Sequence, residues 1–147
     1  MFKMILVPVD LSEVDVARPA LDKAVALAGI TDAKLGLVYV RSILPVTFME
    51  YVPPSFDEEQ QADCEKQIKE LADSLKLAPG RVGTAVRMGS VYNEVLAEAE
   101  KTGADLLVVG SHRPGMATYL LGSNASTIVR HAQCSVLVVR SPDSPKA

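Results

Sequence analysis

Two segments in the last third of the chain have residue types that could bind an anion. They read Gly110-Ser111-His112-Arg113-Pro114-Gly115 and Leu121-Gly122-Ser123-Asn124-Ala125. Gly110 and Gly115 would allow tight turns and let a ligand approach the backbone closely. Hydroxyl and amide residues that follow a glycine at a helix start leave free N–H groups at the positive end of the helix dipole. Together the segments predict one phosphate cradle, although turn glycines and an ordinary helix N-cap explain the spacing equally well.

Several other kinds of site are excluded because their motifs are missing. The chain contains no Gly-Lys-Ser/Thr of a Walker A loop, and the segment Asp10-Leu11-Ser12-Glu13 lacks the glycines of a dinucleotide fingerprint. There is no Gly-x-Ser-x-Gly of a nucleophile elbow. Receiver domains need an acidic cluster after the first strand and an aspartate after the third. Here those positions hold Leu11-Ser12 and Met88-Gly89.

The elements that must position these residues alternate along the chain. Five runs have strand length, at residues 5–9, 34–40, 81–88, 105–109 and 135–139, and the third is more polar than the other four. Four stripes with three- and four-residue spacing lie between them and predict helices. Their members are Ala17, Ala20, Leu21, Ala24 and Ala28; Cys64, Ile68, Leu71, Ala72 and Leu75; Val91, Val95, Leu96 and Ala99; and Ala125, Ile128, Val129 and Ala132.

The alternation predicts a single α/β domain with a doubly wound, five-stranded parallel sheet. Helix caps are expected at Ser12 (a capping box with Asp15), at Asp57 with Gln60, and at Ser90. Ligands of such sheets bind outside the carboxyl ends of the strands, where the winding reverses. The irregular stretch 41–56 is a long surface excursion that could be a lid, a contact surface or disordered. Residues 142–147 are expected to form a flexible tail.

Composition narrows the function classes. The 147 residues carry a net charge of −3 without a dense Lys/Arg run, which argues against a nucleic-acid surface. The apolar run from Met4 to Val9 is too short for a signal or a membrane span, so we expect a cytoplasmic protein with no membrane partner. Cys64 and Cys134 are expected to be free packing residues. A zinc site is improbable with two His and two Cys that are not closely spaced.

Four segments resemble the universal stress protein family over nearly the whole chain. They are Ile5-Leu6-Val7-Pro8-Val9-Asp10, residues 105–112, Leu121-Gly122-Ser123, and residues 134–140. The resemblance implies a Rossmann-like, adenine nucleotide alpha hydrolase-like fold with strand order 3-2-1-4-5. It further implies a homodimer, with ATP bound between the first and fourth strands and Mg²⁺ held by the phosphates.

The family's ATP-binding pattern is Gly-x2-Gly-x9-Gly-Ser/Thr, and this chain matches its ends with Gly110, Gly122 and Ser123. Arg113 stands at the second glycine position, and the loop is one residue shorter. The Ser-His-Arg-Pro and Leu-Gly-Ser-Asn-Ala form resembles a branch of the family that includes ATP binders. Arg113 could replace the lost backbone contact with a charge-assisted bond to phosphate, or it could be a solvated loop arginine.

The resemblance also implies roles for single residues. Asp10 matches an aspartate beside the adenosine, unless it only caps a helix, and Val40 matches a position whose backbone addresses the adenine edge. His112 could be a base, although loop histidines are more often structural. The remaining expected nucleotide contacts are Pro8, Val9, Met88, Gly89, Gly110, Ser111, Arg113, Gly115, Gly122, Ser123, Asn124 and Ala125.

Three functional alternatives remain open. The first is an ATP-holding stress-response module, and the second is a slow ATPase or a self-phosphorylating or adenylylating enzyme. The third is a family member that has lost nucleotide binding. The first is favoured because no lysine or metal-binding carboxylate for phosphoryl transfer stands out beside the loop.

The apolar strand Ser135-Val136-Leu137-Val138-Val139-Arg140 would lie at a sheet edge, where two-fold pairing could form a homodimer.

Overall fold

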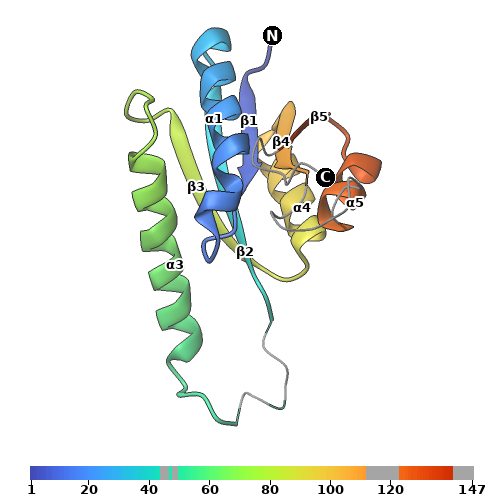
Figure 1. Cartoon of the computed structure of the whole chain (residues 1–147). Coiled ribbons are helices and arrows are strands. Elements are labelled where there is room, and N and C mark those ends of the chain that lie inside the picture. Colours follow the sequence, from blue (N-terminus) through green and yellow to red (C-terminus); the bar gives the residue numbers. More distant parts are fainter. Residues whose placement is uncertain (44–46, 48–49, 112–122, 141–147) are drawn as a thin grey trace, which may run out of the picture.

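The computed structural model describes residues 1–43, 47, 50–111 and 123–140. Strands and helices alternate along it (Figure 1). In chain order the elements are β1 (Met4–Pro8), α1 (Val14–Thr31), β2 (Lys34–Arg41), α3 (Phe56–Asp73), β3 (Val82–Met88), α4 (Val91–Thr102), β4 (Leu106–Gly110), α5 (Ser123–His131) and β5 (Ser135–Val139). The α/β class predicted from the sequence is confirmed.

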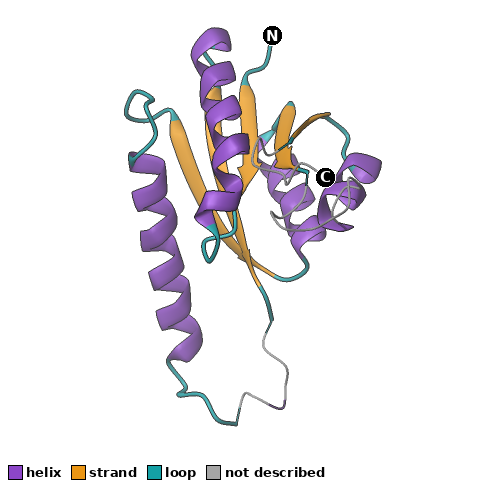
Figure 2. Cartoon of the chain, in the orientation of Figure 1, coloured by secondary structure: helices purple, strands orange, loops and turns teal. Residues whose placement is uncertain are grey.

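All five strands run parallel in the order β3-β2-β1-β4-β5, as predicted. Helices α1 and α3 lie against one face of the sheet, and α4 and α5 lie against the other (Figure 2). The winding therefore reverses between β1 and β4, which places the point expected for a ligand at their carboxyl ends.

Each face of the sheet has its own core. Alternate residues of β1 divide between them, so that Ile5 and Val7 pack under α1 and α3 while Leu6 packs under α4 and α5. These strand residues are at most 1% exposed. Burial on both faces explains why the strands read as continuous apolar runs in the sequence.

Two predicted helix starts are wrong, and the reason in each case is a competing polar contact. Helix α1 begins at Val14, and Ser12 does not cap it, because the Ser12 hydroxyl donates to Asp10 Oδ1 at 2.7 Å. Helix α3 begins at Phe56 after Ser55, and Asp57 pairs with Arg41 Nη2 at 2.9 Å. Ser90 is the N-cap residue of α4, as predicted, although its side chain makes no capping bond.

The predicted apolar stripe of the last helix is only partly buried. Ala125 and Ile128 are 9% and 2% exposed, whereas Val129 is 44% exposed and lies outside the core. Cys64 and Cys134 are both free thiols, as expected. None of the described helices combines the length and the apolar character that crossing a membrane would require.

Candidate nucleotide site

The candidate site lies where β1 and β4 stop pairing. Their register contains only the pairs Ile5↔Leu106 and Leu6↔Leu107, whereas β1 and β2 stay paired up to Pro8↔Val38. Both β1 and β4 continue beyond their shared pairs, toward Pro8 and Gly110. The two strands therefore separate toward their carboxyl ends, at the switch point where open α/β sheets bind ligands.

The backbone of β2 turns one hydrogen-bonding edge toward this point. The Val9 N–H donates to the Val38 carbonyl at 2.9 Å, so the peptide groups of Val38 face β1. The Arg41 carbonyl faces the other way and accepts from the Gly89 N–H at 2.9 Å. Because edges alternate along a strand, the N–H and C=O of Val40 face the β1 side, one step past the last β1–β2 bond.

The end of β4 combines an exposed glycine with a buried serine. A Cβ atom built on Gly110 would meet no described heavy atom within 4 Å. Ser111 is 1% exposed, and its N–H donates to the Val139 carbonyl of β5 at 2.9 Å. Gly110 can therefore face a ligand, while the Ser111 N–H belongs to the sheet.

Asp10 organises the turn that follows β1. Its Oδ1 accepts hydrogen bonds from the Ser12 N–H at 3.0 Å and from the Ser12 hydroxyl at 2.7 Å. Burial and, to a lesser extent, the charge of Asp10 raise the pKa of Tyr39 on β2. Asp10 thus has a local structural role at the site and does not cap α1 with its own side chain. Of its neighbours, Val9 is buried and Pro8 is half-buried.

The turn from β3 into α4 depends on Gly89. Its φ of +142° lies in the region that favours glycine, and a Cβ atom there would meet Glu94 Cγ at 3.2 Å. Met88, the last residue of β3, is paired in register with Arg41. The carboxyl end of β3 therefore lies beside that of β2, and contact of Met88 and Gly89 with a nucleotide stays a prediction.

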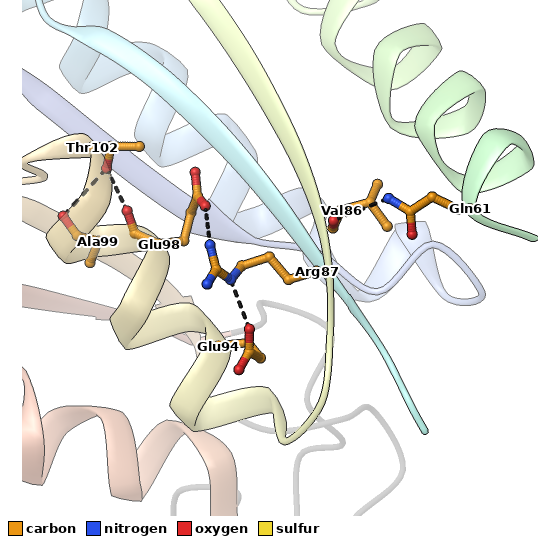
Figure 3. Close-up of polar contacts among 7 residues, drawn as sticks. All are labelled: Gln61, Val86, Arg87, Glu94, Glu98, Ala99 and Thr102. Carbon is orange, nitrogen blue, oxygen red and sulfur yellow. Dashed lines mark hydrogen bonds and ion pairs between the residues drawn. The ribbon is translucent and has the colours of Figure 1, made fainter. Parts of the chain in front are cut away.

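A polar cluster next to this turn was missed in the sequence. Arg87 donates through Nε to Glu94 and through Nη1 to Glu98, both at 2.9 Å (Figure 3). The hydrogen bond with Glu94 is the main reason that the pKa of Arg87 is raised. Glu98 is only 6% exposed. The sequence did contain a signal for this cluster, because two glutamates four residues apart on a predicted helix follow an arginine on the preceding strand.

The residues expected to hold phosphate are only partly described. His112, Arg113, Gly115 and Gly122 lie outside the described residues. Helix α5 begins at Ser123, so its first N–H groups belong to the predicted cradle segment. Asn124 is exposed, whereas Ala125 is buried in the core beside α4.

Neither metal ligands nor reactive thiols characterise the described part of the chain. Residues 1–43, 47, 50–111 and 123–140 contain no group of three His, Cys, Asp or Glu side chains that could hold a metal ion. Burial raises the pKa of both cysteine thiols, which keeps them protonated at neutral pH.

With its five-stranded parallel sheet of order 3-2-1-4-5, the chain has an adenine nucleotide alpha hydrolase-like α/β fold. Residues 1–140 match the Universal stress protein family, and the chain belongs to that family. It is 36% identical to Universal stress protein G of Shigella flexneri, over 95% of this chain and 100% of that protein.

Solved structures share the fold. Universal stress protein UspA from Lactobacillus plantarum is 25% identical with a TM-score of 0.75, over 94% of this chain and 97% of that chain. A universal stress protein in complex with cAMP is 22% identical with a TM-score of 0.70, over the same shares of the two chains. At that identity the second likeness concerns the fold alone.

Proposed function

We propose that this universal stress protein binds ATP at the carboxyl ends of β1 and β4 and acts as a homodimeric, nucleotide-dependent regulatory module. The observation that carries the proposal is that β1 and β4 stop pairing before their carboxyl ends. The backbone N–H and C=O of Val40 lie on one side of this point, and the exposed Gly110 lies on the other.

The adenosine end is supplied by β1 and β2. The Val40 N–H and C=O offer one donor and one acceptor, which is the pattern needed to pair with an edge of adenine. Pro8 and Val9 contribute apolar surface beneath the base, and Asp10 lies at the start of the following turn. Apolar surface combined with a few convergent polar groups is typical of nucleotide recognition.

The phosphate end is supplied by the segment between β4 and α5. The first N–H groups of α5 and the helix dipole favour a negative charge. Arg113 adds a cation in the intervening segment. Bound ATP would bring Mg²⁺ on its own phosphate oxygens, which is how that ion is usually held in nucleotide sites.

The described residues fit binding better than fast hydrolysis. Asp10 is the carboxylate that follows β1, and its Oδ1 already accepts two hydrogen bonds from Ser12. A general base must reach the proton it removes, and this oxygen is committed to the turn. A regulatory role through nucleotide occupancy needs no such base.

The two edges of the sheet differ in a way that supports dimerisation through β5. On β3 the Val86 carbonyl accepts from Gln61 Nε2 of α3 at 3.3 Å, which blunts that edge. On β5 Leu137 is 36% exposed, and its neighbours Val136 and Val138 are half-buried. An apolar edge strand is a template for a second copy, and a two-fold axis would set β5 beside β5.

A pair of strand glycines tests the site. Gly110 and Gly83 both have open space within 4 Å of a built Cβ among the described residues, so valine should fold at either position. Gly110→Val should raise the Kd for ATP at least tenfold, which is about 1.4 kcal/mol, because its side chain would occupy the ligand's place. Gly83→Val, near the amino end of β3, should bind like the parent.

Calorimetric titrations with ATP, GTP and cAMP decide the outcome. ATP should bind more tightly than GTP, because Val40 is proposed to pair with adenine. Parent-like ATP binding by a folded Gly110→Val would move the site elsewhere. A parent protein that binds none of the three nucleotides would favour a family member without nucleotide binding.

A second variant tests the phosphate end. Arg113→Ala should weaken ATP binding by roughly 1.5–3 kcal/mol, the range for a hydrogen bond to a charged group. Adenosine binding should barely change, because adenosine has no phosphate. An equal loss for adenosine and ATP would show that Arg113 acts on the fold of the site.

A further inference from the structure

We propose that Arg87 is a positioning residue for the nucleotide site, acting through Glu94 and Glu98 to fix the Gly89 turn. The inference rests on the proposed function, since it concerns the same carboxyl-end site. The Arg87 side chain lies on the α4 side of the sheet, against Glu94 and Glu98 (Figure 3). The proposal does not require Arg87 to contact the nucleotide.

The first step is the geometry of the cluster. Arg87 lies on β3, two residues before Gly89, while Glu94 and Glu98 lie one turn apart on α4. Its Nε and Nη1 each reach one carboxylate at 2.9 Å. One guanidinium thus ties the last residues of β3 to the first two turns of α4, across the Met88-Gly89-Ser90 connection.

The second step is the contact between this cluster and Gly89. A Cβ atom on Gly89 would lie 3.2 Å from Glu94 Cγ and 3.3 Å from Glu94 Oε2. The Gly89 N–H donates to the Arg41 carbonyl at 2.9 Å. Gly89 is therefore bonded to β2 and lies beside the side chain of Glu94, which in turn accepts a hydrogen bond from Arg87.

The third step is the link to Val40. Arg87 and Val40 are register partners, so the strand segment that carries Arg87 also supports the β2 segment proposed to read adenine. A shift of Gly89 would release the Arg41 carbonyl, one residue after Val40. Through Gly89 and the Arg41 carbonyl, the Arg87 cluster therefore fixes the position of the β2 segment that contains Val40.

Arg81 provides a matched control immediately before the amino end of β3. Its Nη2 donates to the Ala28 and Ala33 carbonyls at 2.7 and 2.6 Å. The side chains of Arg81 and Arg87 are 24% and 26% exposed. Replacing either by methionine removes two arginine hydrogen bonds, but only Arg87 adjoins the proposed site.

The experiment is an ATP titration of Arg87→Met, Arg81→Met and the parent. Arg87→Met should weaken ATP binding by about 2- to 30-fold, the range for side chains that act on a ligand through intermediate contacts. Arg81→Met should change it less than twofold. Equal weakening in both variants would reduce Arg87 to a general stabilising role, and parent-like affinity in Arg87→Met would also overturn the inference.

Conservative variants keep the test decisive if Arg87→Met does not fold. Glu94→Gln retains an oxygen that can accept from Arg87 Nε and should bind ATP within about twofold of the parent, whereas Glu94→Ala should show the full loss expected for this cluster. Equal affinity of the two variants would contradict positioning by the Arg87–Glu94 contact.

Hydrogen exchange separates failure of the inference from failure of the proposed function. In protein without nucleotide, the amides of Gly89, Ser90 and Val91 should exchange faster in Arg87→Met or Glu94→Ala than in Arg81→Met. If the parent binds no ATP, the proposed function fails, and this readout alone decides whether Arg87 fixes the turn. Unchanged exchange at these amides would refute that role.

Discussion

The Arg87–Glu98 pair lends itself to a quantitative stability prediction. Arg87→Met removes two charge-assisted hydrogen bonds of 2.9 Å and leaves Glu98, whose side chain is 8% exposed, without its cation. Breaking a fully buried ion pair costs about 3–5 kcal/mol. The Arg87 and Glu94 side chains are 26% and 27% exposed, so water compensates in part. We expect Arg87→Met to lose about 2–3 kcal/mol of unfolding free energy.

A double variant shows whether that loss comes from the abandoned charge. Replacing a buried ion pair by apolar side chains of similar size is often close to neutral. Arg87→Met combined with Glu98→Met should therefore be more stable than Arg87→Met alone by about 1 kcal/mol or more. The second substitution should thus restore stability rather than remove more of it.

Urea unfolding at pH 7 measures both quantities. All variants must be compared at one protein concentration, because a dimer links stability to concentration. The m-values should agree with that of the parent, so that shifts in midpoint report stability. A loss below about 0.5 kcal/mol for Arg87→Met, within the scatter of surface substitutions, would refute the buried-charge reasoning. A double variant less stable than Arg87→Met would refute it as well.

Three further predictions concern other parts of the sheet. Asp105 accepts from the Lys3 and Met4 N–H groups at 2.8 and 3.0 Å, and these bonds lower its pKa despite the opposing effect of burial. Asp105→Asn should cost about 1–2 kcal/mol at pH 7, and in urea titrations the difference should shrink below about pH 4, as the carboxylate of the parent protonates. Gly36→Val should cost about 1–3 kcal/mol in the same assay by overpacking. A Cβ there would lie 3.2 Å from Cδ1 of the buried Leu6, whereas the nearer Met4 Cε, at 2.7 Å, is the end of a flexible side chain; parent-like stability would contradict this. Val138→Lys should yield monomers in light scattering with ATP binding retained, whereas a persistent dimer would exclude pairing through β5.

The fold was predictable from the sequence because burial on both faces of a parallel sheet leaves a strong local signal. Four of the five strands, such as Leu106–Gly110, are short apolar runs, β3 is more polar, and the helix stripes lie between the strands. The strand order came from the family resemblance, since periodicity alone does not specify which strands are neighbours.

Helix starts and the polar cluster were harder to predict because they depend on which of several possible polar contacts forms, and some of these contacts join residues far apart in the sequence. Ser12 bonds to Asp10 and Asp57 pairs with Arg41, so neither serves as the expected cap. Arg87 meets Glu98 only because the β3–α4 turn brings them together. Val129 fits the helical spacing but lies on the exposed side of α5. A helix of nine residues is too short for its periodicity to distinguish the buried side from the exposed side.

Of the candidate site, the residues that are strand ends were the most predictable. Gly110 lies at the carboxyl end of β4, and Val40 lies one residue before the end of β2, as predicted. The role of Val40 came from the family resemblance, and nucleotide binding by either residue stays a prediction. The roles of Arg113 and Gly122 depend on the segment between β4 and α5 and stay predictions.

The proposed function requires that this protein bind ATP, and any nucleotide that it binds can be identified directly. Purified protein is incubated with an equimolar mixture of ATP, ADP, GTP and cAMP, desalted and denatured, and the supernatant is resolved by ion-exchange chromatography. The parent should release ATP in preference to the other three nucleotides, and Gly110→Val should release little of any. A supernatant from the folded parent that contains no ATP would contradict the account.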